Sequence, residues 1–308
     1  MPPGGPTLDA SKVQPTLLRE KYADDEVQRY EMKMKYRGTG EARASETVHA
    51  VVYRRVVGRT ADKYANLYLR RRDLARRMTE ITDKGHRIVE TTPMDIQPVL
   101  SPIENRVSDK SGKLYFYPCD DRRRFAFTEE RPFHQLNYVS VAFFFPILPK
   151  ELVTVRDTWS GGKLRVMIGW KFYFNNDFPL RSTHTLREFR SIGGHKVAVI
   201  DYDYSGRFDS AEHPDRFTER WRGAGRVIHE AQGYGTAYYD VDLGAVIWKK
   251  DEGTVTVRRE FYMPTTRSSG GRKMTTTETD VVVTKTEVSI TQRLMGKDER
   301  LPGTGPRR

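Results

Sequence analysis

The sequence predicts a mainly β protein, built from two antiparallel β-sheet units (half-barrel or sandwich-like) with extended N- and C-terminal arms. Three observations predict this class: segments rich in branched and aromatic residues recur, glycine-containing turns separate them, and both termini are rich in Pro, Gly and charged residues. With 308 residues, 37% of them hydrophobic and 11% aromatic, the chain has enough apolar material for true cores.

Several segments have the composition of strands. Residues 274–294 are long and rich in Thr and Val, which is typical of a strand with one exposed face. The other segments of this kind are 46–57, 113–117, 163–174 and 254–262.

Turn chemistry predicts two hairpins. Gly193-Gly194 follows 186–192 and precedes the strand around Val197, and Asp242-Leu243-Gly244 separates 235–241 from 245–248. Residues 62–81 are ambiguous, because their apolar residues fit both a helical period and a strand alternation.

The Pro/Leu-rich passage 146–152 is the predicted boundary between the two units. The division is an extended N-terminal arm (1–28), a first β unit (29–149), a second β unit (150–296) and a C-terminal tail (297–308).

The chain is basic, with 53 Lys and Arg against 41 Asp and Glu and a formal net charge of +12. Such a charge favours a polyanionic binding partner. The alternatives are an acidic protein assembly, an anionic membrane surface and an RNA. The sequence has no secretory signal pattern and no apolar stretch of membrane-spanning length. We therefore expect a cytoplasmic protein or one peripheral to a membrane.

Catalytic motifs are missing from the sequence. The single cysteine, Cys119, rules out an internal disulfide and stands beside Asp120 and Asp121, which disfavour a reactive thiolate. The seven histidines occur singly, and no Walker loop or Gly-x-Ser-x-Gly elbow is present. These observations predict a protein that is not an enzyme and binds no cofactor, with calcium as the one open option.

Calcium is suggested by the segment 201–212. Its oxygen-bearing residues and a glycine at the sixth position follow the spacing of a twelve-residue calcium loop, although 196–204 alternates like a strand. On the strand interpretation, two carboxylates simply lie on a solvated face. The candidate metal ligands are Asp201, Asp203, Ser205, Asp209 and Glu212.

Arginine runs are the candidate partner-binding residues, since guanidinium groups bind phosphate and carboxylate in bidentate fashion. Phe125 and Phe127 beside the second run predict either base stacking with RNA or ordinary core packing. The two runs comprise Arg70, Arg71, Arg72, Arg76 and Arg77, and Arg122, Arg123 and Arg124.

Aromatic residues near the predicted boundary suggest a different role. Phe143, Phe145, Trp170 and Phe172 would line an apolar cavity in a half-open β structure, or pack between the two units.

Three segments, 149–159, 193–200 and 233–240, together resemble the second half of uncharacterised bacterial β-rich proteins with two half-barrel-like units. The resemblance covers about residues 149–250 and rests on structural glycines and aromatics. It implies a fold and no activity.

These observations predict a non-catalytic accessory or scaffolding subunit. It would dock on a larger protein assembly, membrane-associated assemblies included, through its basic surfaces and extended arms. The alternatives are a carrier of an apolar ligand or lipid and an RNA-binding protein.

Overall fold

The computed structural model describes residues 1–19, 27–40, 44–59, 65–82, 85–91, 106–108, 114–116, 146–167, 177–212, 225–269 and 272–300. These residues form a ten-stranded sheet, a two-stranded sheet and two short 3-10 turns. Every strand pair is antiparallel, so the predicted mainly antiparallel β class is confirmed.

The large sheet consists of two meanders. The first contains β1 (Val27–Gly40), β2 (Ala44–Arg59), β3 (Ala65–Thr82) and β4 (Gly85–Thr91). The second contains β7 (Thr158–Met167), β8 (Asp177–Ile192), β9 (His195–Asp209), β10 (Gly225–Asp240), β11 (Ala245–Ser269) and β12 (Arg272–Leu294). The small sheet pairs β5 (Arg106–Ser108) with β6 (Leu114–Phe116).

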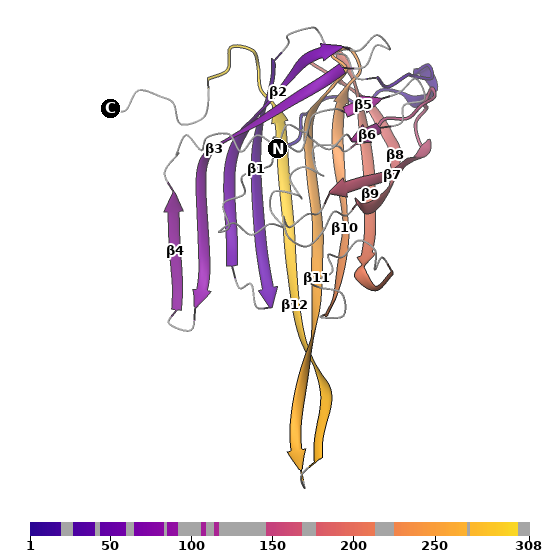
Figure 1. The fold of residues 1–308 in the computed structure, drawn as a ribbon. Coiled ribbons are helices and arrows are strands. Elements are labelled where there is room, and N and C mark those ends of the chain that lie inside the picture. The colour runs from indigo at the N-terminus through magenta and orange to yellow at the C-terminus, as the bar shows by residue number, and fades with distance from the viewer. Residues whose placement is uncertain are drawn as a thin grey trace, which may run out of the picture.

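The meanders join at their chain ends. The strand order is β4-β3-β2-β1-β12-β11-β10-β9-β8-β7, so β1 of the first meander pairs with β12 of the second, over residues 30–40 and 284–294. Figure 1 shows a curved, open sheet with β4 and β7 at its edges. The strands of both predicted units thus share one sheet, and their folding as separate units stays a prediction.

The predicted turns are present. Gly193 and Gly194, with φ of 59° and 83°, join β8 to β9, and Gly244, with φ of 67°, ends the turn between β10 and β11. Glycine suits these positions because positive φ is strained for residues with a Cβ. The ambiguous segment 62–81 is a strand over its described part, since β3 hydrogen-bonds to both β2 and β4.

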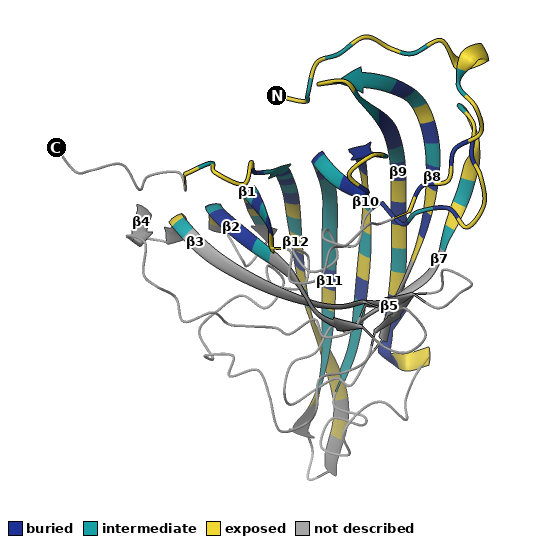
Figure 2. Cartoon of the chain, turned by 90° about the horizontal axis from the view of Figure 1, so that it is seen from above, coloured by how far each residue is buried: buried dark blue, intermediate teal, exposed yellow. Residues whose placement is uncertain are grey.

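The main core lies on one face of the sheet, which we call the inner face; the opposite face is the outer face. On β1, Tyr30, Met32, Met34 and Tyr36 are buried on the inner face, and the residues between them lie on the outer face. Figure 2 shows this alternation of buried and exposed residues along the strands. The inner-face cluster also contains Val48, Ala50, Val52, Ile147, Tyr202, Tyr204, Phe208, Ala237, Val288 and Ile290.

The described part of the N-terminal arm packs against the second meander. Leu18 is fully buried in a cluster with Leu186, Phe189 and Tyr239. The backbone of residues 6–8 adds to the free edge of β8, where the Leu8 N–H donates to the Phe189 carbonyl at 2.8 Å. The sheet of the same chain thus holds residues 6–18 in place, because the arm contains a few apolar residues that this sheet buries.

The beginning of the predicted C-terminal tail also contacts the sheet. Arg29 donates to the Lys297 carbonyl, and Glu299 accepts from Arg293 at 2.7 and 3.0 Å. Residues 301–308 lie outside the described residues.

Candidate interaction surfaces

The structure does not bring the five predicted calcium ligands together. Residues 201–209 belong to the extended strand β9, in which Asp201 and Asp209 are separated by roughly 26 Å at the usual rise per residue. Asp203 and Ser205 are exposed on the outer face, and Glu212 lies in the following 3-10 turn. The loop geometry expected from the spacing is thus wrong, because cross-strand pairing with β8 and β10 keeps the backbone extended.

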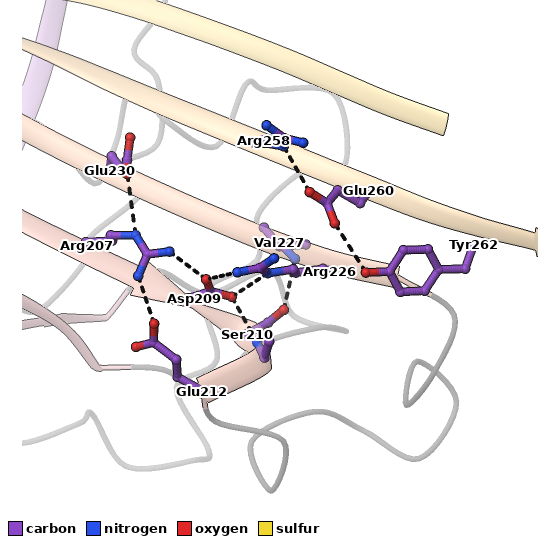
Figure 3. A network of polar contacts seen from close by, with 11 residues as sticks. Arg207, Asp209, Ser210, Glu212, Arg226, Val227, Glu230, Arg258, Glu260 and Tyr262 are labelled. Atoms are coloured by element: carbon purple, nitrogen blue, oxygen red, sulfur yellow. Dashed lines mark hydrogen bonds and ion pairs between the residues drawn. The ribbon is translucent and has the colours of Figure 1, made fainter. Parts of the chain in front are cut away.

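Asp209 instead organises an ion network at the end of β9 (Figure 3). Its carboxylate is fully buried and accepts from Arg226 Nε at 2.9 Å, from Arg207 Nη2 at 2.6 Å and from the Ala211 N–H at 3.0 Å. The hydrogen bonds from Arg226 lower the pKa of Asp209 to about 2, although burial acts in the opposite direction.

The network continues along the neighbouring strands. Arg207 also donates to Glu212 at 2.8 Å and lies 3.4 Å from Glu230. On β11, Glu260 accepts from Arg258 Nε at 2.9 Å and from the Tyr262 hydroxyl at 3.2 Å (Figure 3). These contacts fix the ends of β9 and β10 where β11 leaves the sheet.

Beyond this network, β11 and β12 leave the sheet as a two-stranded ribbon, which we define as residues 262–283. At this end of the sheet, the pairing of β10 with β11 stops at Gly225, the first residue of β10, which lies opposite Phe261. The pairing of β1 with β12 stops at Gly40, the last residue of β1, which lies opposite Thr284. Figure 1 shows the ribbon projecting past the ends of the neighbouring strands. The β11 part, Tyr262–Ser269, reaches roughly 26 Å beyond the sheet at the usual rise per residue.

The ribbon has exposed apolar side chains and a basic tip. Met263, Val281 and Val283 are 50%, 42% and 45% exposed. The sequence 264–277 contains Arg267, Arg272 and Lys273, seven Ser and Thr residues, and no carboxylate. The reasoning from sequence recognised the strands 254–262 and 274–294 but missed the ribbon, which their unusual combined length around Gly270-Gly271 could have revealed.

The first predicted arginine run lies on β3 and alternates between the two faces. The register pairs Arg71 with Val52 and Arg76 with Val48, which are buried inner-face residues. It pairs Arg70 with Tyr53, Arg72 with Val51 and Arg77 with Thr47, which lie at outer-face positions. By this backbone register, the positions of the run alternate between the two faces of the sheet. The Arg77 side chain is exposed. Partner binding by these arginines stays a prediction.

The remaining sequence-based candidates lie outside the described residues. They are Cys119, Arg122, Arg123, Arg124, Phe125, Phe127, Phe143, Phe145, Trp170 and Phe172.

Buried charges lie on the inner face of β11. Lys249 and Asp251 are each 1% exposed and form an ion pair of 3.4 Å, and the Tyr202 hydroxyl donates to Asp251. Burial lowers the pKa of Lys249 and raises that of Asp251, since both charged forms lose hydration. A Cβ at Gly235 would lie 2.5 Å from Cζ of Tyr202. The absence of a side chain at Gly235 therefore leaves room for the Tyr202 ring, whose hydroxyl reaches Asp251.

His184 is fully buried next to Tyr202, which lies directly opposite it in the β8–β9 register, with ring centroids 5.7 Å apart. Its Nε2 accepts from the Ile147 N–H at 3.0 Å, and its ring stacks on Trp159 with centroids 5.6 Å apart. Burial lowers the pKa of His184 to about 4, so the ring is neutral at pH 7.

A cavity of about 750 Å³ is lined by residues of β1, β9, β10, β11 and β12. Its lining contains Tyr36, Tyr204, Gly233, Gly253 and Val288 together with outer-face residues of the same strands, among them Lys35, Arg37, Tyr234 and Glu252. Gly233 and Gly253 face each other in the β10–β11 register, and the Tyr204 ring lies over Gly233, where a Cβ would be 2.3 Å from the tyrosine hydroxyl oxygen. The cavity is a candidate ligand site.

His195, Asp240 and Asp242 lie close enough to bind one metal ion. Their hydrogen bonds, however, already explain their proximity, because these bonds stabilise two turns. Asp240 accepts from His195 at 2.8 Å and from the N–H groups of Asp242 and Leu243, and Asp242 accepts from the Lys196 N–H. These bonds fasten the β8–β9 turn to the β10–β11 turn.

No helix in the described parts of the chain is long and apolar enough to cross a membrane. The resemblance to bacterial β-rich proteins stays a prediction. Comparison with known proteins finds no family model that matches the chain and no match among curated proteins.

Proposed function

We propose that the protein is a non-catalytic accessory or scaffolding subunit that docks on a larger protein assembly through its projecting ribbon. The observation that carries this proposal is the pair of strands that continues beyond all described neighbours of the sheet. The basic net charge of +12 favours an assembly with an acidic surface.

The ribbon is costly to maintain without a partner. A two-stranded hairpin is at best marginally stable in water, and its outer edges present unpaired backbone groups. Met263, Val281 and Val283 add exposed apolar surface along it. A partner that packs on these side chains or adds a strand to an edge would offset both costs.

The role expected of the N-terminal arm changes accordingly. Leu18 and the backbone of residues 6–8 belong to the packing of the second meander, so deletion of the arm would destabilise the sheet and give no clean test of docking. The ribbon is the better element to remove.

The test is a variant with a shortened ribbon. Phe261 and Asp280 face each other in the register, and joining them through Asn-Gly would close the hairpin at the edge of the sheet. The full-length and shortened proteins would be tagged, isolated from the source organism and analysed by native mass spectrometry. We expect a stoichiometric complex with the full ribbon and a free subunit of unchanged melting temperature without it.

Recovery of the same complex with both proteins, or of a bare monomer with both, would contradict the proposal. Val281→Thr together with Val283→Thr is the milder variant, because threonine keeps the branched shape and the β-propensity. It should weaken association without changing the length of the ribbon.

The cavity over Gly233 and Gly253 supports a second candidate, a carrier of an apolar ligand. Gly253→Phe should fill the cavity and abolish binding of a fluorescent fatty-acid probe, whereas Gly4→Phe, outside the cavity at a site where an added Cβ meets nothing within 4 Å, should leave binding unchanged. Equal probe binding by the two variants, or no binding by the parent protein, would exclude this candidate.

A further inference from the structure

A row of basic side chains lies on the outer face of β1. Lys33, Lys35 and Arg37 alternate with the buried residues Met34 and Tyr36, and all three are exposed. Consecutive members of the row are about 7 Å apart, since side chains on one face of a strand recur every second residue.

The charges of this row are largely uncompensated. Lys35 and Arg37 form no ion pair with any described residue, and Lys33 lies 3.7 Å from Glu31, which accepts stronger bonds from Arg293. Glu287 faces Arg37 in the register, but its ion pair is with Lys285 at 3.9 Å.

Hydroxyl groups flank the row on both neighbouring strands. Thr47 of β2 and Ser289 of β12 lie opposite Lys35. Ser45 lies opposite Arg37, and Thr291 lies opposite Lys33. An exposed sheet face that combines regularly spaced cations with hydroxyl donors has the chemistry of a phosphate-backbone contact.

We propose that this outer face of β1 and its neighbours β2 and β12 binds the phosphate backbone of single-stranded RNA. An extended strand of RNA presents a linear series of negative charges, which matches a linear row of cations better than the scattered carboxylates of an acidic protein. A membrane surface is disfavoured because interfacial binding needs apolar side chains beside the cations. Of the exposed large apolar side chains on this face of β1 and β12, Val27 lies at the far end of β1, and Val281 and Val283 lie in the ribbon, beyond the residues of β12 that pair with β1.

The contact is independent of base identity. The neighbouring outer-face residues opposite Lys33, Lys35 and Arg37 are hydroxyl-bearing, His49 or Glu287, so the row offers no Phe, Tyr or Trp ring for base stacking, and the His49 ring is hydrogen-bonded to Glu31 at 2.8 Å. The site differs from the ribbon, and its test does not depend on the docking proposed above.

The experiment measures binding of a fluorescein-labelled oligouridylate to the full chain by anisotropy over a range of KCl concentrations. The variant combines Lys33→Gln, Lys35→Gln and Arg37→Gln. The matched control combines Lys12→Gln, Lys150→Gln and Arg181→Gln, three exposed residues whose loss changes the net charge equally.

For the β1 variant, the slope of the logarithm of affinity against the logarithm of salt concentration should fall by about 2, because each phosphate contact on a single strand contributes about 0.7. The control should keep the parent slope. Equal slopes for both variants would overturn the location, and absence of RNA binding by the parent protein would overturn the proposal. Vesicles containing phosphatidylserine serve as the competing ligand: binding to them that exceeds RNA binding and is lost in the β1 variant would assign the row to a membrane instead.

Discussion

Two regions of one sheet use charge in opposite ways. In β8–β11, three sets of ionisable groups are paired or buried: Asp209 with two arginines, Lys249 with Asp251, and a neutral His184. On the outer face of β1, Lys35 and Arg37 face water and form no ion pair with described residues. Both regions share the same strand alternation, so the difference comes from the neighbouring strands. Paired, buried charges serve the fold, whereas unpaired, exposed ones are available to a ligand.

The largest expected effect is the loss of the buried pair. Asp251→Ala should lower the free energy of unfolding by about 3–5 kcal/mol, because it leaves the Lys249 ammonium buried without its counter-charge. Urea unfolding would measure it. The triple variant Lys249→Met, Asp251→Leu and Tyr202→Phe removes the charges together and should lie close to the parent protein. If Asp251→Ala were as stable as the parent protein, the buried Lys249–Asp251 pair would not stabilise the fold, and the contrast with β1 would not hold for it.

His184 predicts a pH dependence of stability. Its pKa is lowered in the folded state from 6.5 to about 4, so below pH 6.5 the unfolded chain binds a proton that the folded chain does not. Stability should fall as pH falls from about 6.5 to 4, by about 3 kcal/mol at most. Urea midpoints at several pH values would measure this, and His184→Gln should flatten the profile; an unchanged profile would refute the assignment.

Asp209 and Asp203 give a matched pair on one face of β9. Asp209→Asn should cost about 2 kcal/mol at pH 7, since it removes the charge that Arg226 and Arg207 bind, whereas Asp203→Asn, at an exposed position, should cost less than about 0.5 kcal/mol. The folded pKa of Asp209 is depressed, so its contribution is present above about pH 4 and is lost as pH falls toward 2. Equal effects of the two substitutions on the melting temperature would contradict the network of Figure 3.

The smallest effect is expected on β1. Lys35→Gln together with Arg37→Gln should change the free energy of unfolding by less than about 0.5 kcal/mol, because neither side chain forms an ion pair with described residues. A loss above 1 kcal/mol in urea unfolding would mean that the row serves the fold after all.

The sequence by itself determined the class and much of the local structure. Branched and aromatic segments predicted strands, and Gly193-Gly194 and Gly244 predicted turns that the φ angles confirm, because strand alternation and positive φ are local properties. The alternation of Tyr30, Met32, Met34 and Tyr36 with basic residues is an equally local signal, which could have identified the β1 row.

Only the tertiary structure decided which strands become neighbours. Pairing with β2 and β4 made 65–82 a strand where periodicity allowed a helix, and pairing with β8 and β10 kept 201–209 extended where ligand spacing suggested a loop. The joining of β1 to β12, the exit of the ribbon from the sheet and the partners of Asp209 and Lys249 all depend on contacts between residues far apart in the chain. Such contacts are set by the packing of the whole sheet, which no local pattern of residues specifies.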